Sequence, residues 1–213
     1  MHGVFSCPEL SAASEELSIA ELKRGRAGAR HVLSLGSVSE IAHSDQLLSI
    51  ARGVLGLGAI PFRATFFDKS PNSNWLVAWH QDTALPLTEK REIPGWGPWS
   101  IKDGVIYAHA PAAALEQVLA LRIHLDDSIE INGPLRVIPH THYSGVLTDS
   151  QIQKGASDSP GVVCVVPAGG VIAMRPLIIH ASSKSESDFP RRVLHIEYAP
   201  SRKIADGLEL ALV

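Results

Sequence analysis

Two side chains that can bind a metal ion stand two positions apart at the end of an apolar run. In the segment WLVAWHQDTAL, residues 75–85, His80 and Asp82 interrupt a stretch that should otherwise be buried. Residues two apart on a β-strand face the same way, so we expect His80 and Asp82 to project together and Gln81 to point to the other side. The first two either pair with each other or hold a metal ion with a third ligand.

His180 is the best candidate for the third ligand. It ends the apolar run VIAMRPLII, and a polar loop follows it. Like His80, it therefore stands where a buried strand ends. Two histidines and one carboxylate form the facial triad that is typical of non-haem iron(II) oxygenases, which keep open positions for substrate and dioxygen.

An arginine opens the next β-rich segment after this histidine. If a polar loop joins two antiparallel strands here, Arg191 lies beside His180. A guanidinium next to a metal is suited to bind the far carboxylate of a chelating dicarboxylate in bidentate fashion. Ser182 shares a strand face with His180 and would add a hydrogen bond, whereas Arg192 must face away from Arg191.

The elements that position these residues change character along the chain. Residues 1–58 show capped helical patterns, whereas residues 60–200 contain short β-rich segments separated by turn sequences. We expect a single domain over residues 1–213, mainly β with flanking helices, in which the helical part packs on a sandwich or barrel-like core. The segment APAAALEQVLAL adds one more helical turn.

A long stretch from Glu89 to Gly104 has little structural signal and carries two tryptophans. Loops of this length are often functional. We expect either a lid over a pocket or a surface loop pinned by buried Trp96 and Trp99.

The composition excludes several classes of protein. The net charge is -3, and the densest basic segment, Lys23 to Arg30, is interpreted as a solvated helix end rather than a nucleic-acid-binding arm. No apolar run reaches the length of a membrane span. Cys7 and Cys164 are far apart and predict no disulfide framework. We expect a soluble, cytoplasmic protein with a small-molecule substrate and no nucleic-acid or membrane partner.

Four sequence motifs agree in order and spacing: FFDKSP, WHQD, NGPLRVIP and HASS followed by PRRVLHIEY. Together they resemble the phytanoyl-CoA dioxygenase family of iron(II)- and 2-oxoglutarate-dependent oxygenases, including bacterial members of unassigned substrate. The resemblance covers residues 63–199. We interpret Lys69, within the first motif, as a turn residue, and the alternative is a contact with the co-substrate.

The resemblance implies a double-stranded β-helix, which is a jelly-roll of two sheets. It implies iron(II), 2-oxoglutarate and dioxygen as cofactor and co-substrates. The implied iron ligands are His80, Asp82 and His180. The implied contacts of 2-oxoglutarate are Arg191, with help from Ser182 and Gln81.

The chain departs from the family pattern at two positions. His140 replaces a small residue after the GPLRV motif, and Arg122 stands where some relatives place a tryptophan against 2-oxoglutarate. The carboxylate ligand Asp82 is present, which disfavours chlorination, because the related halogenases carry a small residue there.

The implied reaction is hydroxylation of a C–H bond in a small organic substrate, with release of succinate and carbon dioxide. One alternative is a catalytically silent, cupin-like metal- or ligand-binding protein. Another is a metal-dependent lyase or zinc hydrolase that does not use 2-oxoglutarate. Arg191 separates these, because a hydrolase has no need of a buried arginine across from an open metal face.

Other histidines are expected to have supporting roles. His124 and Asp126 should form a structural pair on one strand face. His195 and Glu197 should line the core or support the metal ligands, and His109 lies where it would line the mouth of a pocket.

Overall fold

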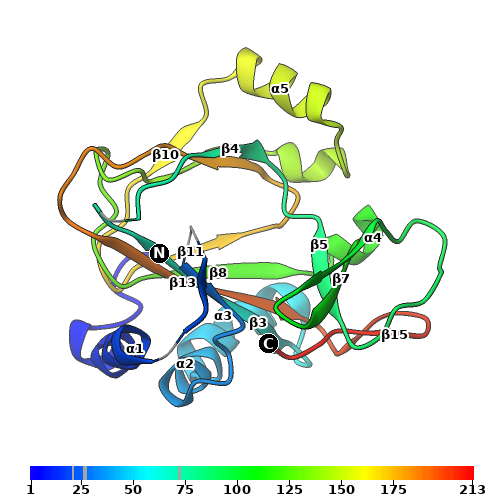
Figure 1. Ribbon diagram of the computed structural model, residues 1–213, viewed down its shortest axis with the longest axis horizontal. Helices are drawn as coiled ribbons and strands as arrows, with labels where there is room; N and C mark the ends of the chain where they lie inside the picture. Colours follow the sequence, from blue (N-terminus) through cyan, green and yellow to red (C-terminus); the bar gives the residue numbers. More distant parts are fainter. Residues whose placement is uncertain (21, 26–27, 72) are drawn as a thin grey trace.

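Two sheets face each other in the computed structural model, which describes residues 1–20, 22–25, 28–71 and 73–213 (Figure 1). The larger sheet has six antiparallel strands in the order β1-β2-β3-β13-β8-β11. Its strands are β1 (Arg24–Gly25), β2 (Gly28–Arg30), β3 (Ile60–Lys69), β13 (Arg191–Ala199), β8 (Leu119–His124) and β11 (Val171–Met174).

The facing sheet has four antiparallel strands in the order β10-β9-β12-β4. Its strands are β10 (Val162–Cys164), β9 (Leu135–Ile138), β12 (Ile179–Ser182) and β4 (Val77–His80). The two sheets form the double-stranded β-helix that the resemblance implied.

Two smaller sheets close one end of this sandwich. One has the order β5-β7-β6, and the other pairs β14 with β15. Their strands are β5 (Ala84–Leu87), β7 (Val105–His109), β6 (Trp99–Lys102), β14 (Lys203–Ala205) and β15 (Leu208–Glu209).

Helices cover the outer faces. Figure 1 shows α1, α2 and α3 below the six-stranded sheet and α5 above the four-stranded sheet. The helices are α1 (Cys7–Ile19), α2 (Gly36–Ala42), α3 (Asp45–Leu55), α4 (Ala112–Leu115), α5 (Asp149–Asp158) and the 3-10 helix η1 (Thr141–Ser144). The expected helical turn near residue 112 is therefore present as α4. No helix in the described parts of the chain is long and apolar enough to span a membrane.

Alternation along β13 explains how one strand serves two environments. Leu194, Ile196 and Tyr198 pack into the apolar cluster that joins the sheet to the first three helices. Arg191, His195 and Glu197 alternate with them and point to the inner side, toward the four-stranded sheet. This strand thus has a mainly apolar outer face and a mainly polar inner face, and nearly all of its residues are buried.

We expected the basic segment from Lys23 to Arg30 to be a solvated helix end, and this prediction is wrong. Its described residues form β1 and β2, and β2 pairs with β3 through the register Arg30↔Thr65. Residues 26 and 27 lie outside the described part. Strands of two or three residues are too short to show a period in sequence, which explains the wrong prediction.

The tryptophan loop matches the second of its two interpretations. Trp96 is buried within an apolar cluster with Leu85, Leu115 and Leu177, and Trp99 packs against the same cluster. Trp99 also begins β6, so the irregular stretch is shorter than the sequence indicated. The loop is pinned by apolar packing.

A pair of leucines tests this division between core and surface. Leu121 on β8 is fully buried in the cluster under the helices, whereas Leu57 is 89% exposed. We expect Leu121→Ala to lower the free energy of unfolding by about 2–5 kcal/mol, because it leaves a cavity. The matched control Leu57→Ala should change it by no more than about 0.5 kcal/mol. Urea unfolding of the metal-free protein, followed by circular dichroism, measures both, and equal losses would contradict the fold.

Candidate metal centre

The register between β4 and β12 brings two candidate ligands face to face. His180 pairs directly with His80 across the two antiparallel strands, and their ring centroids lie 4.2 Å apart. Asp82 follows the end of β4, where its backbone N–H donates to the Pro176 carbonyl at 2.9 Å. One ligand atom from each of the three side chains lies within 4.8 Å of the others. The facial triad expected from sequence is therefore assembled.

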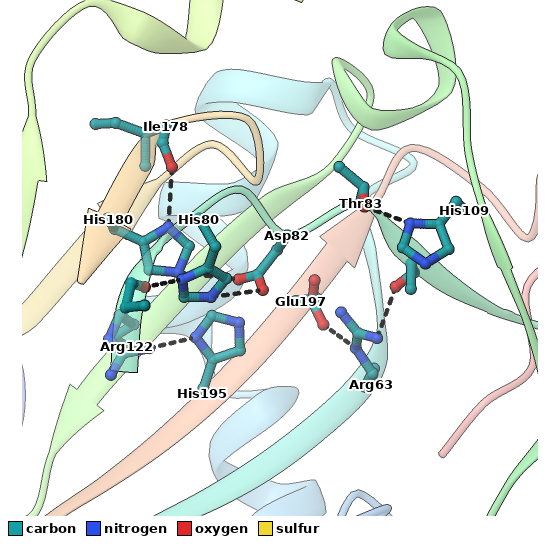
Figure 2. A network of polar contacts seen from close by, with 12 residues as sticks. Arg63, His80, Asp82, Thr83, His109, Arg122, Ile178, His180, His195 and Glu197 are labelled. Atoms are coloured by element: carbon teal, nitrogen blue, oxygen red, sulfur yellow. Dashed lines mark hydrogen bonds and ion pairs between the residues drawn. The ribbon is translucent and has the colours of Figure 1, made fainter. Parts of the chain in front are cut away.

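Both imidazole rings are oriented by backbone carbonyls. The Nδ1 atoms of His80 and His180 lie 2.8 Å and 2.9 Å from the carbonyl oxygens of Ala78 and Ile178, to which they donate (Figure 2 shows the second contact). This fixes the tautomer in which Nε2 carries the lone pair. These Nε2 atoms lie 3.6 Å and 3.4 Å from the two carboxylate oxygens of Asp82.

The electrostatics of the triad favour a bound cation. Burial opposes the charged form of Asp82, but His180 and His80 outweigh it and hold the pKa of this carboxyl well below its usual value. Burial likewise acts against protonated His80, yet the hydrogen bond to Asp82 raises its pKa overall. Lone pairs that face a carboxylate require a positive charge between them, either a proton or a metal ion. A divalent metal ion fits the donor set.

A cavity of about 90 Å³ opens beside the triad on its β9 side. Arg191 lines it and is buried, and its Nε donates to the Asn132 carbonyl at 3.3 Å. Its Nη1 is buried without a hydrogen-bond partner among the described residues. Because an unpaired buried guanidinium N–H is costly, this atom indicates an anionic ligand in the cavity.

The neighbouring arginine points away, as alternation predicts. Arg192 donates from Nε and Nη2 to the two carboxylate oxygens of Asp126, at 2.8 Å and 2.7 Å. Asp126 is thereby engaged, and the predicted pair of His124 with Asp126 is wrong. His124 is fully buried, and neither ring nitrogen has a hydrogen-bond partner among the described residues. Burial, followed by nearby Arg122 and Arg191, lowers its pKa to about 3, so the ring is neutral.

Lys69 differs from the turn residue that the sequence analysis favoured. It is not in a turn but is the last residue of β3, pairs with Arg191 and is fully buried. Its Nζ donates to Ser182 Oγ at 2.7 Å and to the Ser183 carbonyl. Burial, with the charges of Arg191 and Arg122, lowers its pKa to about 7. Strand alternation was the sequence signal for its position. Lys69 lies two residues after Phe67, which lines the cavity, and therefore faces the same inner side of β3.

Ser182 and Arg122 complete the wall of this cavity. Ser182 Oγ also donates to the Gly133 carbonyl at 2.8 Å, so the serine is fixed between β12 and the segment before β9. Arg122 Nη1 donates to His195 Nδ1 at 3.0 Å, while its Nε is buried without a partner among the described residues (Figure 2). Arg122, which stands where some relatives have a tryptophan, therefore adds a second arginine to the wall of the cavity.

Gln81 does not point into this cavity, which corrects the expectation that it contacts 2-oxoglutarate. Its side-chain NH₂ donates to the carbonyls of Gly145 and Leu177, at 2.9 Å and 2.7 Å. Its side-chain oxygen accepts from the Leu147 N–H at 2.8 Å. As alternation predicts, it faces away from its two neighbours, and it anchors the backbone near residue 145 behind the triad.

A second cavity, of about 340 Å³, lies on the other side of the triad and shares His80 and Asp82 with the first. His195 and Glu197 line it, and Glu197 accepts an ion-paired hydrogen bond from Arg63 (Figure 2). His109 also lines it, and its Nδ1 lies 2.7 Å from Thr83 Oγ1. The triad thus stands between two chambers, one small and one larger.

Comparison with known proteins agrees with this geometry. Residues 12–193 match the family model described as phytanoyl-CoA dioxygenase. L-proline trans-4-hydroxylase from Streptomyces griseoviridis is 28% identical over 138 residues, which are 53% of this chain and 51% of that protein. The alignment thus spans about half the length of this curated relative.

Solved structures share the fold at low sequence identity. EctD from S. alaskensis, with 2-oxoglutarate and 5-hydroxyectoine, is 17% identical with a TM-score of 0.69, covering 95% of this chain and 71% of that one. HygX from Streptomyces hygroscopicus, with nickel and 2-oxoglutarate bound, is 16% identical with a TM-score of 0.65, covering 94% and 81%.

Removal of the carboxylate tests whether the triad binds metal. We expect Asp82→Ala to weaken binding of Mn(II) by about 100-fold or more, a loss of about 2.7 kcal/mol, because one of three ligands is lost. Asp149→Ala, at the exposed start of α5, should leave the affinity unchanged. Isothermal titration calorimetry at pH 7.5 measures both, and equal affinity in the two variants would show that Asp82 is merely a structural partner of the histidines.

Proposed function

Because this chain belongs to the phytanoyl-CoA dioxygenase family of iron(II)- and 2-oxoglutarate-dependent oxygenases and carries an intact triad, we propose that it hydroxylates a C–H bond of a small organic molecule. The reaction would consume dioxygen and 2-oxoglutarate and release succinate and carbon dioxide. Iron(II) would be held by His80, Asp82 and His180. The similarity to L-proline trans-4-hydroxylase supports a small substrate. Because the alignment spans about half the length of that relative, the substrate of this chain is part of the proposal.

The observation that carries this proposal is the buried guanidinium of Arg191 beside the triad, one nitrogen of which has no hydrogen-bond partner among the described residues. Its Nη1 is buried, lines the small cavity and lacks a partner among the described residues. A carboxylate there would accept from it and from Ser182 or Lys69, which line or border the same wall. This combination of an open metal site and a carboxylate-binding arginine matches the two ends of 2-oxoglutarate.

The chain's own residues would supply binding, orientation and exclusion of water. When bound, the iron and 2-oxoglutarate supply the oxidising power for the reaction. The carbonyl-anchored rings of His80 and His180 keep both Nε2 atoms aimed at one point. Gln81 fixes the backbone behind the triad, and Phe67 separates the two chambers by lining both.

The alternative functions account for fewer of these observations. A silent metal-binding protein or a zinc hydrolase needs the triad but leaves Arg191 and Lys69 buried without an anion. Succinate release separates the candidates. The iron-loaded protein given 2-oxoglutarate and dioxygen should form succinate, whereas a silent module or a hydrolase should form none.

Neighbouring arginines provide a matched test of co-substrate binding. We expect Arg191→Ala to weaken binding of 2-oxoglutarate to the Mn(II)-loaded protein by about 30-fold or more, because truncating one partner of a buried charge pair costs about 2–5 kcal/mol. Arg192→Ala removes the adjacent guanidinium, which pairs with Asp126 instead. Its affinity for 2-oxoglutarate should stay within about threefold of wild type. Anaerobic calorimetry reports both, and the reverse ranking would contradict the assignment.

The lowered pKa of Lys69 leads us to expect that the protein takes up a proton when 2-oxoglutarate binds. At pH 8 the amine, with its pKa of about 7, is mostly neutral. The pKa values of Arg191 and Arg122, lowered by burial to about 9 and about 10, still leave both arginines charged. A carboxylate beside Lys69 would raise its pKa and favour the ammonium form, so binding takes up close to one proton per site.

This uptake is measured as the dependence of binding enthalpy on the ionisation enthalpy of the buffer, with phosphate and Tris compared at pH 8. Lys69→Met should remove most of it, while Lys154→Met on the exposed face of α5 should not. A binding enthalpy that is independent of buffer in the wild-type protein would exclude this role for Lys69.

A further inference from the structure

The larger chamber carries positive charge that the metal site does not use. Its cationic side chains are Arg30, Arg63 and Lys102, and its carboxylates are Asp82 and Glu197. Asp82 belongs to the triad, so a single carboxylate remains to balance three cations. This chamber lies across the triad from the cavity assigned to 2-oxoglutarate, and the co-substrate therefore cannot supply the missing negative charge.

One of the three cations is already neutralised. Arg63 forms an ion pair with buried Glu197, donates from Nη1 to the Ala84 carbonyl at 3.0 Å, and lies 5.7 Å from the centre of the Tyr107 ring. Burial raises the pKa of Glu197, but the carboxylate is held by Arg63. This pair forms a fixed, nearly neutral wall of the chamber.

Lys102 has no such partner. It ends β6, and among the described residues no carboxylate lies within ion-pair distance of its Nζ, which sits 4.8 Å from the centre of the Tyr107 ring. The ring is itself fixed, because His31 Nε2 lies 2.9 Å from the Tyr107 hydroxyl. Burial, with the charges of Arg63 and Arg30, lowers the pKa of Lys102. An anion would relieve this repulsion.

Arg30 also lines the chamber. It ends β2, which lies between β1 and β3 in the six-stranded sheet, and is paired in register with Thr65, another lining residue. Its side chain is 53% exposed, and its guanidinium lies 3.6 Å from Asp103. Asp103 also pairs with Lys23 at 2.7 Å, so it is shared between two cations. Arg30 thus retains capacity to bind an anion at the mouth of the chamber.

Resting on the function proposed above, we propose that the oxidised substrate is a small polar molecule with a carboxylate, which Lys102 and Arg30 bind at the end of the chamber that they line. The carboxylate would fix the molecule so that a C–H bond faces the metal bound at His80 and Asp82. Except for Phe67 and Ala84, every residue lining the chamber carries a polar or charged group. Such walls suit a short polar molecule better than a fatty acyl chain.

The test compares carboxylates with their uncharged counterparts. The iron-loaded protein with 2-oxoglutarate and dioxygen is given glycine, each of the nineteen L-amino acids, and a series of short mono- and dicarboxylates other than succinate. Each is matched by its carboxamide, and octanoyl-CoA serves as the acyl-chain probe. Succinate release is measured against the rate without any added compound. We expect at least one carboxylate to accelerate succinate release by about tenfold or more, while its carboxamide does not.

Variants locate the effect in the chamber. Lys102→Met keeps the length of the side chain and removes its charge, and it should raise the KM for that carboxylate by about tenfold or more. Arg30→Met should act in the same direction. In both variants the Kd for 2-oxoglutarate should stay within about twofold of wild type, which also shows that they fold. Lys154→Met, on remote α5, is the matched control and should change neither constant.

Each contrary outcome has a distinct meaning. The substrate inference is overturned if carboxamides or octanoyl-CoA accelerate succinate release as well as the carboxylates do. It is also overturned if Lys102→Met and Arg30→Met leave the KM unchanged, or if no carboxylate acts although 2-oxoglutarate binds. If wild-type protein does not bind 2-oxoglutarate, the proposed function fails and this inference fails with it.

Discussion

Buried positive charge on the inner face of the six-stranded sheet is the constraint on which the site depends. Lys69, Arg122 and Arg191 stand on three neighbouring strands, all are buried, and none has a carboxylate within ion-pair distance among the described residues. Burial comes first among the causes that lower the pKa of each, and their mutual repulsion adds to it at Lys69 and Arg191. Unpaired buried cations destabilise a fold. A dianionic co-substrate in the adjacent cavity would supply the charge that the chain itself lacks.

The strand registers turn this constraint into a layout with two chambers. Across the inner face, Arg191 lies opposite Lys69, while Glu197 lies opposite Arg63. The first row consists of two cations and borders the small cavity, whereas the second is an ion pair and borders the larger one. The triad is carried mainly by the opposite sheet and stands where the two chambers meet. This arrangement needs helices on the outer face, because the alternate residues of the same strands are apolar.

Strand alternation accounts for most of what the sequence could predict. It placed His80 and Asp82 on one face with Gln81 on the other, and it required Arg191 and Arg192 to face opposite ways. These inferences depend on a period of two and need no knowledge of distant contacts. The choice of Arg191 over Arg192 came from its spacing after His180. The motif resemblance added the jelly-roll fold, because family order and spacing carry long-range information that local periodicity does not.

The errors share a physical origin in contacts between residues far apart in sequence. Lys69 looked like a turn residue because its partner Ser182 is 113 positions away. Asp126 lies beyond the end of β8, so alternation did not apply, and Arg192 rather than His124 binds it. Gln81 was assigned to the co-substrate, but backbone groups near residues 145 and 177 engage its amide. The strand β2 forms because β3 offers it an edge, and β1 in turn pairs with β2.

The most direct measurement is an anaerobic titration of the metal-free protein with iron(II) and then 2-oxoglutarate, followed by visible absorption. Chelation of iron(II) by the keto acid gives a metal-to-ligand charge-transfer band. Our account predicts that this band saturates at one equivalent of each in the wild-type protein and is absent when Asp82→Ala and Arg191→Ala are combined. If the folded wild-type protein binds iron(II) but gives no band with 2-oxoglutarate, the central claim is wrong, and the two chambers serve another ligand.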